Sequence, residues 1–266
     1  MPELPEVETI ARDLAPKITG RTIVGVDVRW RRSVDERGLA ARSLVGDTVV
    51  GVRRLGKYVT FDLASGRTAT VHLRMTGRLI ADPPAKLPHT RIVMRFEDGG
   101  SLVLSDVRKF GRLRIIEGDP RAALAIGIDP FDPALTPARL HELMHGRRTK
   151  IKVWLLDQRR LAGIGNIYAS EALFDARIRP TRQAGKLTLS HASALLRSLR
   201  KVMRKAIYHR GSSIDDYVDA EGKPGEFQKK LAVYGRGGLP CRRCQATIRR
   251  AVLAQRGTFF CPVCQL

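Results

Sequence analysis

Four cysteines near the C-terminus form two pairs with the same internal spacing. Each pair reads Cys-x-x-Cys, and 16 residues separate the two pairs. The four residues are Cys241, Cys244, Cys261 and Cys264. Thiolates at this spacing typically bind one Zn²⁺ in a closed tetrahedral site, with no position left open for a substrate. Two disulfides are the alternative, and the cytosolic context that we expect argues against them. We therefore predict one structural zinc.

The segment around these cysteines is predicted to be a basic β-hairpin. Residues 247–253 and 258–260 have the composition of strands and flank the turn residues 255–257. Arg256 would then lie at the tip of the hairpin. From residue 226 onward, eight Lys and Arg residues stand against one acidic residue, Glu226. Because a two-stranded hairpin is marginally stable by itself, bound metal would hold it rigid.

The N-terminus combines a helix start with two residues that the helix does not need. Apolar residues recur at helical spacing after Pro5 and predict a helix from Pro5 to Ile18. A proline in the first turn and glutamates near the positive end of the helix dipole are both favourable. Pro2 and Glu3 precede this helix and are not explained by it. The local pattern leaves open whether they have a role in function.

Charge is the strongest signal in the composition. The 266 residues include 48 Lys and Arg against 26 Asp and Glu, a formal net charge of +22, and the excess is spread along the chain. Such a surface favours a polyanionic partner, because basic side chains release counterions from a phosphate backbone. We expect nucleic acid. A cationic surface without a partner and an anionic membrane surface are the alternatives.

The chain lacks the sequence patterns of membrane and secreted proteins. No apolar run reaches the roughly 18 residues that a transmembrane helix needs. The start has no basic-then-apolar signal pattern. We therefore expect a cytoplasmic protein, associated with the nucleoid through DNA. A monomer is expected because no self-complementary surface is evident.

Periodicity divides the chain into a β-rich part and a helical part. Residues 21–116 contain short alternating segments separated by Gly- and Asp-containing turns, which predict a β-sandwich or barrel under the N-terminal helix. Residues 119–134 are rich in Pro and Asp and resemble a linker. The helices expected after it are 136–145 with Thr136 as cap, 150–161, 167–176, and a longer one capped by Ser190 and closed by Gly211.

These features together are similar to the Fpg/Nei family of bacterial enzymes that repair oxidised DNA bases, and the similarity covers essentially the whole chain. It is carried by the motifs PELPEVE, RLGKYVTFDL, HLRMTGRL, SDVRKFGRL, LLDQRRLAGIGNIYASEALF, GKPGEFQ, VYGR and RGTFFCPVCQ. The resemblance implies an α+β fold of two domains: an N-terminal helix with a β-sandwich, and a helical domain with a helix–two-turn–helix and a β-hairpin zinc finger. The boundaries that we predict are 1–118 for the catalytic domain, 119–134 for the linker, 135–225 for the helical domain and 226–266 for the finger.

The resemblance implies a bifunctional DNA glycosylase and abasic-site lyase acting on oxidised purines in duplex DNA, such as 8-oxoguanine and formamidopyrimidines. In such enzymes the initiator Met is removed and the next residue, here Pro2, becomes the nucleophile. Its secondary amine can form a Schiff base with the sugar. Glu3 would act as general acid and base. Lys57 would reach a phosphate beside the lesion and assist catalysis, whereas a solvated lysine is the alternative.

The resemblance also implies DNA-binding residues. A base that reacts must leave the stack, and Met75, Arg108 and Phe110 match the residues that fill the resulting gap. Ordinary core positions are the alternative for Met75 and Phe110. Phosphate contacts are expected from Asn166 and Arg256 at one phosphate, and from His72, which has a structural role as its alternative. This chain has Arg74 and Thr76 where HLGMSG is the commoner pattern, which alters the local backbone and charge.

Two other functions remain open at this point. An endonuclease VIII-type relative would act on oxidised pyrimidines, although PELPEVE and the long loop before GKPGEFQ favour purines. A damaged-DNA-binding protein without catalysis is the second alternative. The presence of Pro2, Glu3 and Lys57 together argues against it.

Overall fold

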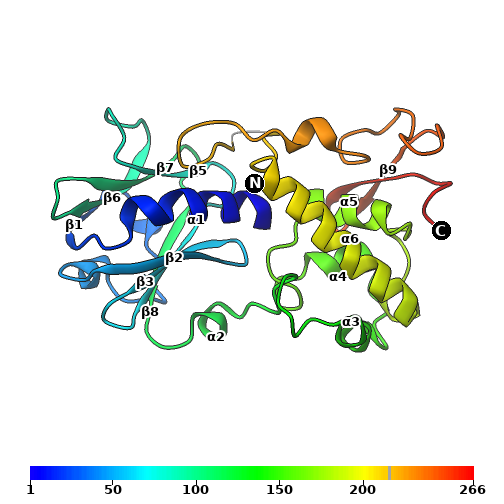
Figure 1. The fold of residues 1–266 in the computed structure, drawn as a ribbon, viewed down its shortest axis with the longest axis horizontal. Helices are drawn as coiled ribbons and strands as arrows, with labels where there is room; N and C mark the ends of the chain where they lie inside the picture. Colours follow the sequence, from blue (N-terminus) through cyan, green and yellow to red (C-terminus); the bar gives the residue numbers. More distant parts are fainter. Residues whose placement is uncertain (215–216) are drawn as a thin grey trace. The chain divides into compact units, whose positions relative to one another are not determined.

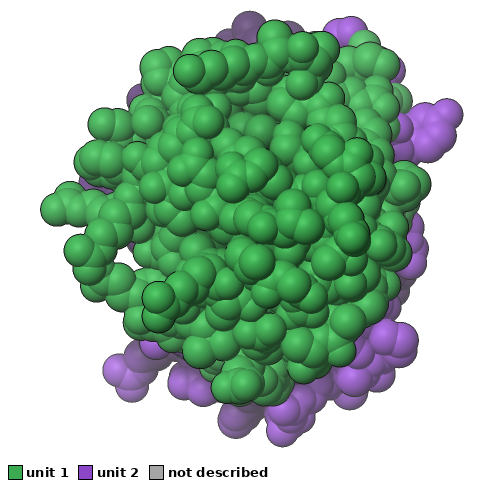
Figure 2. Space-filling view, turned by 90° about the vertical axis from the view of Figure 1, so that its left-hand side faces the viewer, with its two compact units in different colours: residues 1–124, 209–228 green, residues 125–208, 229–266 purple. Residues whose placement is uncertain are grey.

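A computed structural model of the chain describes residues 1–214 and 217–266. It contains two compact units (Figure 2): unit 1 comprises residues 1–124 and 209–228, and unit 2 comprises residues 125–208 and 229–266. Residues 209–228 therefore pack with the N-terminal part of the chain, although the sequence placed most of them in the helical domain. The domain boundaries derived from the sequence stay a prediction. The loop expected at residues 212–225 includes 215–216, which lie outside the described residues.

Unit 1 is a sandwich of two four-stranded antiparallel sheets. The first has the order β1-β6-β7-β5, and the second has the order β2-β3-β4-β8. The strands are β1 (Ile23–Val28), β2 (Val49–Leu55), β3 (Tyr58–Leu63), β4 (Thr68–His72), β5 (Gly77–Ala81), β6 (Thr90–Phe96), β7 (Ser101–Asp106) and β8 (Arg112–Ile116). Apolar residues from both sheets form one buried core. The predicted sandwich is confirmed.

Helix α1 (Leu4–Ile18) packs along the sandwich (Figure 1). Its apolar side chains, including Val7, Ile10 and Leu14, are fully buried in the same core as the strands. The helix contacts β2 and β5, which are edge strands of the two different sheets. It starts one residue before the predicted position and ends where predicted. Its N-terminal end is therefore fixed against the strands.

Short helical segments fill the connections of unit 1. The 3₁₀ turns are η1 (Arg31–Ser33) and η2 (Ala41–Leu44), and the helix α2 (Pro120–Leu124) lies inside the predicted linker. Asp119 starts α2, because its carboxylate accepts the backbone N–H of Arg121 at 2.9 Å and of Ala122 at 3.3 Å. The Asp-Pro sequence read as linker is thus also a helix N-terminus.

Unit 2 contains the remaining helices. They are α3 (Pro137–Met144), α4 (Ile151–Leu156), α5 (Asn166–Asp175), the 3₁₀ turn η3 (Ala184–Lys186) and α6 (Leu189–Tyr208). Thr136 caps α3 as predicted, accepting the N–H of Arg139 at 3.1 Å. No helix among the described residues is long and apolar enough to cross a bilayer.

Two helix boundaries differ from the predictions. The helix predicted at 150–161 ends at Leu156, since Asp157 accepts the N–H of Arg159 at 3.1 Å and starts a turn. Ser190 does not cap α6 but lies within it. Thr188 precedes the helix instead, and its hydroxyl accepts the N–H of His191 at 3.4 Å.

The chain ends in a hairpin of β9 (Arg249–Leu253) and β10 (Arg256–Phe260), preceded by the 3₁₀ turn η4 (Phe227–Lys230). Its turn residues are Ala254 and Gln255, both with positive φ, at 47° and 58°. Two such residues form the tight turn that matches the twist of paired strands. Arg256 pairs with Leu253, so it is the first residue of β10. The prediction that Arg256 lies at the tip of the hairpin is therefore wrong.

Candidate functional site

The first residues of unit 1 are buried and held in place. Pro2 is buried, and Glu3 and Glu6 are 2% and 1% exposed. The backbone N–H of Glu3 donates to Oε2 of Glu6 at 2.8 Å. Such a reciprocal cap fixes the direction in which the chain enters the helix. Burial and this cap together hold Pro2 in a single position at the start of the helix.

Glu6 also ties this terminus to the loop that follows α6. Its Oε1 accepts the backbone N–H of Ser212 at 2.8 Å. Gly211 has a φ of +83°, and a Cβ there would lie 2.8 Å from Cγ of Glu6. Glycine at 211 is therefore required both by its conformation and by the close approach of Glu6. One carboxylate thus connects the N-terminus with the start of the 212–225 loop.

Lys57 lies in the two-residue turn between β2 and β3, where Leu55 pairs with Tyr58. Its side chain is 7% exposed, which excludes the solvated lysine considered above. Arg54 connects this turn to α1, because its Nε donates to Glu8 Oε2 at 2.9 Å and its Nη1 to the carbonyl of Gly56 at 3.5 Å. The turn that carries Lys57 is therefore anchored to the first turns of the helix that follows Pro2 and Glu3.

His72 ends β4 and is 8% exposed. Its ring packs edge-on against Tyr58 with centroids 4.8 Å apart, and its Nδ1 accepts the backbone N–H of Arg74 at 3.0 Å. Burial, together with the positive charges of Arg74 and Lys57, lowers the pKa of His72 to about 3. A neutral ring whose Nδ1 is an acceptor carries its proton on Nε2. His72 is thus a neutral N–H donor at physiological pH.

The depressed pKa of His72 predicts an acid-dependent loss of stability. As the pH falls below the ordinary value of about 6.5, the unfolded chain takes up a proton that the folded chain does not accept until about pH 3. The free energy of unfolding should therefore fall with pH in this window, by about 1.4 kcal/mol per pH unit for this group. His72→Asn keeps an acceptor for the Arg74 N–H and removes the titration. Urea unfolding between pH 6.5 and pH 4 should show a shallower decline for the variant, and parallel curves would contradict this account.

Two neighbouring turns carry the residues expected to fill the gap left by a displaced base. Met75 is half-buried in the turn between β4 and β5, and Arg108 and Phe110 lie in the turn between β7 and β8. Asp106 joins the turns: its Oδ1 accepts the hydroxyl of Thr76, and its Oδ2 accepts the N–H of Gly111 at 2.6 Å. This 1% exposed carboxylate thereby sets the spacing between the two turns.

The second of these turns presents apolar and cationic groups to solvent. Phe110 is 46% exposed, which excludes the core position considered for it. The guanidinium of Arg108 lies 4.9 Å from the centre of the Phe110 ring, and Nζ of Lys109 lies 4.3 Å from the centre of the Trp30 ring. Cations over aromatic faces restrict side chains that would otherwise be free. The turn is thus suited to insert between bases.

In unit 2, the side chains of Asn166 and Lys152 meet at the carbonyl of Gly257, the residue that follows Arg256. Asn166 begins α5, and its Nδ2 donates to the carbonyl of Gly257 at 3.1 Å. Lys152 is fully buried, and its Nζ donates to the same carbonyl at 2.9 Å and to the hydroxyl of Thr258 at 2.8 Å. The start of β10, with exposed Arg256, is therefore held at the N-terminus of α5. Helix N-termini favour anions, so this arrangement suits a phosphate.

Glu171 is a second buried charge in unit 2, and it was not among the residues predicted from the sequence. Its carboxylate accepts three consecutive backbone N–H groups, those of Ala232, Val233 and Tyr234, at 2.8 to 2.9 Å. It fixes the segment that leads into the zinc finger. An acidic residue inside the otherwise apolar run of α5 is the signal that could have identified it.

Glu171→Gln is expected to lower the free energy of unfolding of unit 2 by about 1–3 kcal/mol, since an amide presents an N–H group to one of the three donors. Glu142→Gln is the matched control, because Glu142 makes an exposed ion pair with Arg139, and such pairs contribute less than about 1 kcal/mol. Denaturant unfolding of both variants tests this. If both variants lost the same free energy of unfolding, the three hydrogen bonds to Glu171 would stabilise unit 2 no more than an exposed ion pair does.

The four cysteines form one cluster. Their sulfur atoms all lie within 4.8 Å of one another, with Cys241 and Cys264 4.0 Å apart and Cys244 and Cys261 3.5 Å apart. Tetrahedral Zn²⁺ with bonds of about 2.3 Å requires sulfurs about 3.8 Å apart. None of the four is in a disulfide. The residues therefore fit one structural zinc.

The buried groups around the zinc site are few. They are Phe174, Val233, Cys241, Ile248 and Cys261. Gln265 is buried and links the finger to the segment that follows α5, accepting the N–H of Cys261 at 2.9 Å and donating to the carbonyl of Ile178 at 2.8 Å. So small a core cannot hold the hairpin without metal.

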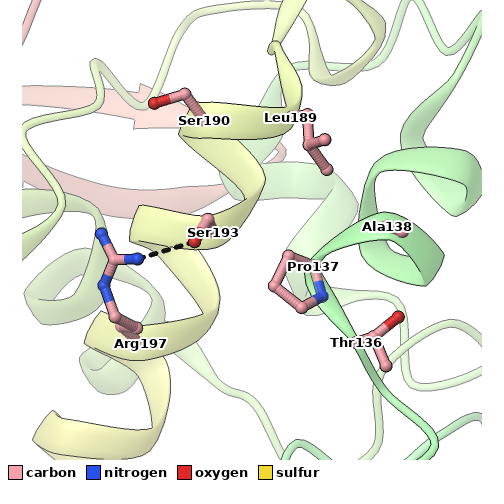
Figure 3. Close-up of a pocket in the computed structure, with 7 residues that line it drawn as sticks. All are labelled: Thr136, Pro137, Ala138, Leu189, Ser190, Ser193 and Arg197. Carbon is pink, nitrogen blue, oxygen red and sulfur yellow. Dashed lines mark hydrogen bonds between the residues drawn. The ribbon is translucent and has the colours of Figure 1, made fainter.

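A pocket of about 590 Å³ lies between the N-terminal ends of α3 and α6 (Figure 3). Its lining is Thr136, Pro137, Ala138, Leu189, Ser190, Ser193 and Arg197. Arg197 donates to the hydroxyl of Ser193 at 2.6 Å. None of the predicted site residues lines this pocket, so it is separate from the candidate site.

Three family models match successive parts of this chain. The formamidopyrimidine-DNA glycosylase N-terminal domain matches residues 1–113, and the formamidopyrimidine-DNA glycosylase H2TH domain matches residues 126–218. The zinc finger found in FPG and IleRS matches residues 238–266. Together they span the sandwich, the helices and the cysteine cluster.

Individual relatives match over the whole length. The formamidopyrimidine-DNA glycosylase of Chloroflexus aggregans is 44% identical over 272 residues, which cover 100% of this chain and 99% of the relative. The Lactococcus lactis Fpg in complex with Fapy-dG-containing DNA is 35% identical with a TM-score of 0.88, and 99% of each chain is covered. Its complex with DNA containing an abasic site is 36% identical, with a TM-score of 0.88 and the same coverage.

Proposed function

Because this chain belongs to the formamidopyrimidine-DNA glycosylase family, we propose that it removes oxidised purines from duplex DNA and then cleaves the strand at the abasic site. It is a DNA glycosylase of damaged DNA with one structural zinc. The parts that we propose are the class of damaged base, oxidised purines, and a covalent intermediate on Pro2. The observation that carries it is the buried Pro2–Glu3 terminus, which Glu6 holds at the start of α1.

In the proposed reaction, loss of Met1 leaves Pro2 with a free secondary amine. An α-amine loses its proton near pH 8, and the positive end of α1 behind it favours the neutral form. The nitrogen attacks C1′ of the damaged nucleotide, and the bond from C1′ to the base breaks, so the base leaves with that electron pair. Glu3 takes up the proton that the nitrogen of Pro2 loses on bonding to C1′ and transfers it to the ring oxygen, which opens the sugar and forms the iminium.

The iminium makes strand cleavage possible. It acidifies the protons on C2′, and removal of one expels the 3′-phosphate by β-elimination. A second elimination expels the 5′-phosphate, and hydrolysis of the Schiff base returns the free amine of Pro2. Both steps need only a base and water, and the proton transfers are assigned to Glu3 in this proposal. The products are two DNA ends that each carry a phosphate.

The other site residues are assigned to DNA binding in this proposal. Lys57 and the neutral Nε2–H of His72 contact phosphates beside the lesion, which the anchored turn and the burial of both groups support. Met75, Arg108 and Phe110 fill the space of the displaced base. In unit 2, Asn166 and Arg256 bind one further phosphate, and the zinc, when bound, holds the hairpin that carries Arg256.

The choice of oxidised purines rests on the family. The related Lactococcus lactis protein is seen with Fapy-dG-containing DNA and with an abasic site, the substrate and the intermediate of the proposed sequence. The net charge of +22 suits a duplex partner. No observation on this chain favours oxidised pyrimidines.

Strand incision tests the proposal. Duplexes that contain 8-oxoguanine opposite cytosine, a formamidopyrimidine, or an oxidised pyrimidine are incubated with the protein, and the ends of the products are identified. Cleavage of the two purine substrates with a phosphate on both ends is expected. Binding without cleavage would indicate a DNA-binding protein that lacks catalysis, and preferred cleavage of the pyrimidine duplex would indicate the endonuclease VIII-type activity.

A further inference from the structure

Arg74 adopts a left-handed backbone conformation, which glycine adopts more readily than arginine. Its φ is 58°, in the left-handed region where a Cβ is crowded by the backbone. Its side chain is exposed, and among the described residues its guanidinium makes no hydrogen bond or ion pair. An arginine in this position therefore contributes nothing visible to the stability of the fold. The guanidinium of Arg74 is therefore available to a ligand.

Arg74 lies in a pocket of about 400 Å³ with three other arginines, Arg32, Arg37 and Arg112, and with Asp35 and Glu36. Arg37 is neutralised, since it donates to both carboxylate oxygens of Asp35 at 2.9 and 2.7 Å. Arg112 is fixed by donating to the carbonyls of Lys109 and Gly111, each at 2.9 Å.

Arg32 is the fourth arginine of the pocket. Like Arg74 it is exposed, and its guanidinium has no hydrogen-bond or ion-pair partner among the described residues. Four arginines against two carboxylates leave the pocket net positive, with two uncommitted guanidinium groups at its rim.

The pocket adjoins the residue expected to contact DNA. Arg112 is the direct cross-strand partner of His72. The backbone N–H of Arg74 donates to Nδ1 of that ring at 3.0 Å. Met75, expected to enter the duplex, follows Arg74 in the chain. A strand whose phosphate contacts His72 would therefore pass beside the two free guanidinium groups.

We infer that Arg74 and Arg32, with Arg112 beside them, bind a second phosphate of the DNA strand, next to the one at His72. Guanidinium groups match the geometry of phosphate oxygens better than other cations. The inference rests on the proposed function in one respect, that duplex DNA is the ligand. It adds a contact that depends on residue 74 of this chain.

The salt dependence of DNA binding tests the inference. Each phosphate neutralised adds about 0.9 to the slope of log Kobs against log of the salt concentration. Binding of a short duplex with an uncleavable abasic analogue is measured by fluorescence anisotropy between about 50 and 200 mM NaCl. Arg74→Gly and Arg32→Ala should each reduce the slope, the double variant should reduce it by about 0.9 in total, and Arg74→Lys, which keeps the charge, should retain it.

Two controls make the result specific. Arg42→Ala removes an equal charge from η2 outside the pocket and should leave the slope unchanged. Arg74→Gly should have an unchanged or higher thermal midpoint, because glycine accepts the φ of residue 74, so weaker binding would not reflect unfolding. The inference would be overturned if Arg74→Gly and Arg32→Ala kept the wild-type salt-dependence slope. It would also be overturned if Arg42→Ala reduced the slope as much as they do.

The same preparations separate this inference from the proposed function. If the wild-type protein binds the duplex but does not cleave damaged DNA, the catalytic proposal fails, and the slopes still decide whether the pocket binds phosphate. If the wild-type protein cleaves damaged DNA and Arg74→Gly keeps the full slope, the catalytic proposal stands and only the phosphate pocket is rejected.

Discussion

Protein that retains Met1 is expected to bind DNA with an abasic site but to cleave it at least ~10³-fold more slowly than protein that begins at Pro2. With Met1 attached, the nitrogen of Pro2 belongs to a peptide bond, and its lone pair is delocalised into the carbonyl. It can then form no iminium. Helix α1 and the buried Glu3 are in place with Met1 present, so the loss would be chemical rather than structural. Single-turnover strand cleavage measures it.

The matched control uses the same polypeptide. Protein produced while methionine removal is inhibited is divided, and one half is treated with a methionine aminopeptidase. Treatment should restore cleavage, whereas the affinity for an uncleavable abasic duplex should be the same in both halves. Full cleavage by the protein that still carries Met1 would show that the nucleophile lies elsewhere.

Cys244→Ser is expected to release the zinc, unfold residues around the hairpin of β9 and β10, and weaken DNA binding about 10-fold or more. The zinc site supplies most of the order in this part of unit 2, since its buried core is small. Loss of the hairpin removes the phosphate contact proposed for Arg256 and the other basic residues of the finger. Metal content, limited proteolysis and anisotropy report the three effects.

Cys244→His provides the control for the zinc prediction. Zinc accepts three thiolates and one imidazole in structural sites, so this variant should keep one zinc per chain and most of its DNA affinity. The sandwich of unit 1 should resist proteolysis in both variants, because its core is separate. A Cys244→Ser protein that keeps its hairpin and its affinity would show that the metal is dispensable.

The parts of this molecule that could be predicted from sequence are those with local signals. Helix α1 follows from apolar residues at helical spacing, and the zinc cluster follows from the spacing of its cysteines. The sandwich follows from alternation in short segments. In each case the pattern lies within one element or one pair of motifs, so no tertiary partner has to be known.

The boundaries that failed were decided by side chains competing for the same backbone groups. Asp157 ends α4 five residues before the predicted end, and Thr188 caps α6 although Ser190 is an equally good cap by type. Propensity does not distinguish two hydroxyl residues this close. The turn of the finger lies at Ala254 and Gln255 and not at the predicted residues 255–257. Both residues adopt positive φ although neither is a glycine, so residue type did not reveal the turn.

The buried polar residues around the site could not be predicted, because their partners are distant in sequence. Asp106 joins the turns at Thr76 and Gly111, and Lys152 reaches Gly257 across more than a hundred residues. A single sequence shows such residues only as charges in apolar surroundings. Their positioning role becomes visible once the strands and helices are assembled.

Borohydride trapping on a duplex that contains one 8-oxoguanine opposite cytosine tests the central claim most directly. Reduction of the Schiff base links protein and DNA permanently, and peptide mapping identifies the nitrogen involved. The account predicts one cross-link, on the peptide that begins with Pro2, in protein that has lost Met1. Binding without a cross-link, or a cross-link on a lysine such as Lys57, would contradict it.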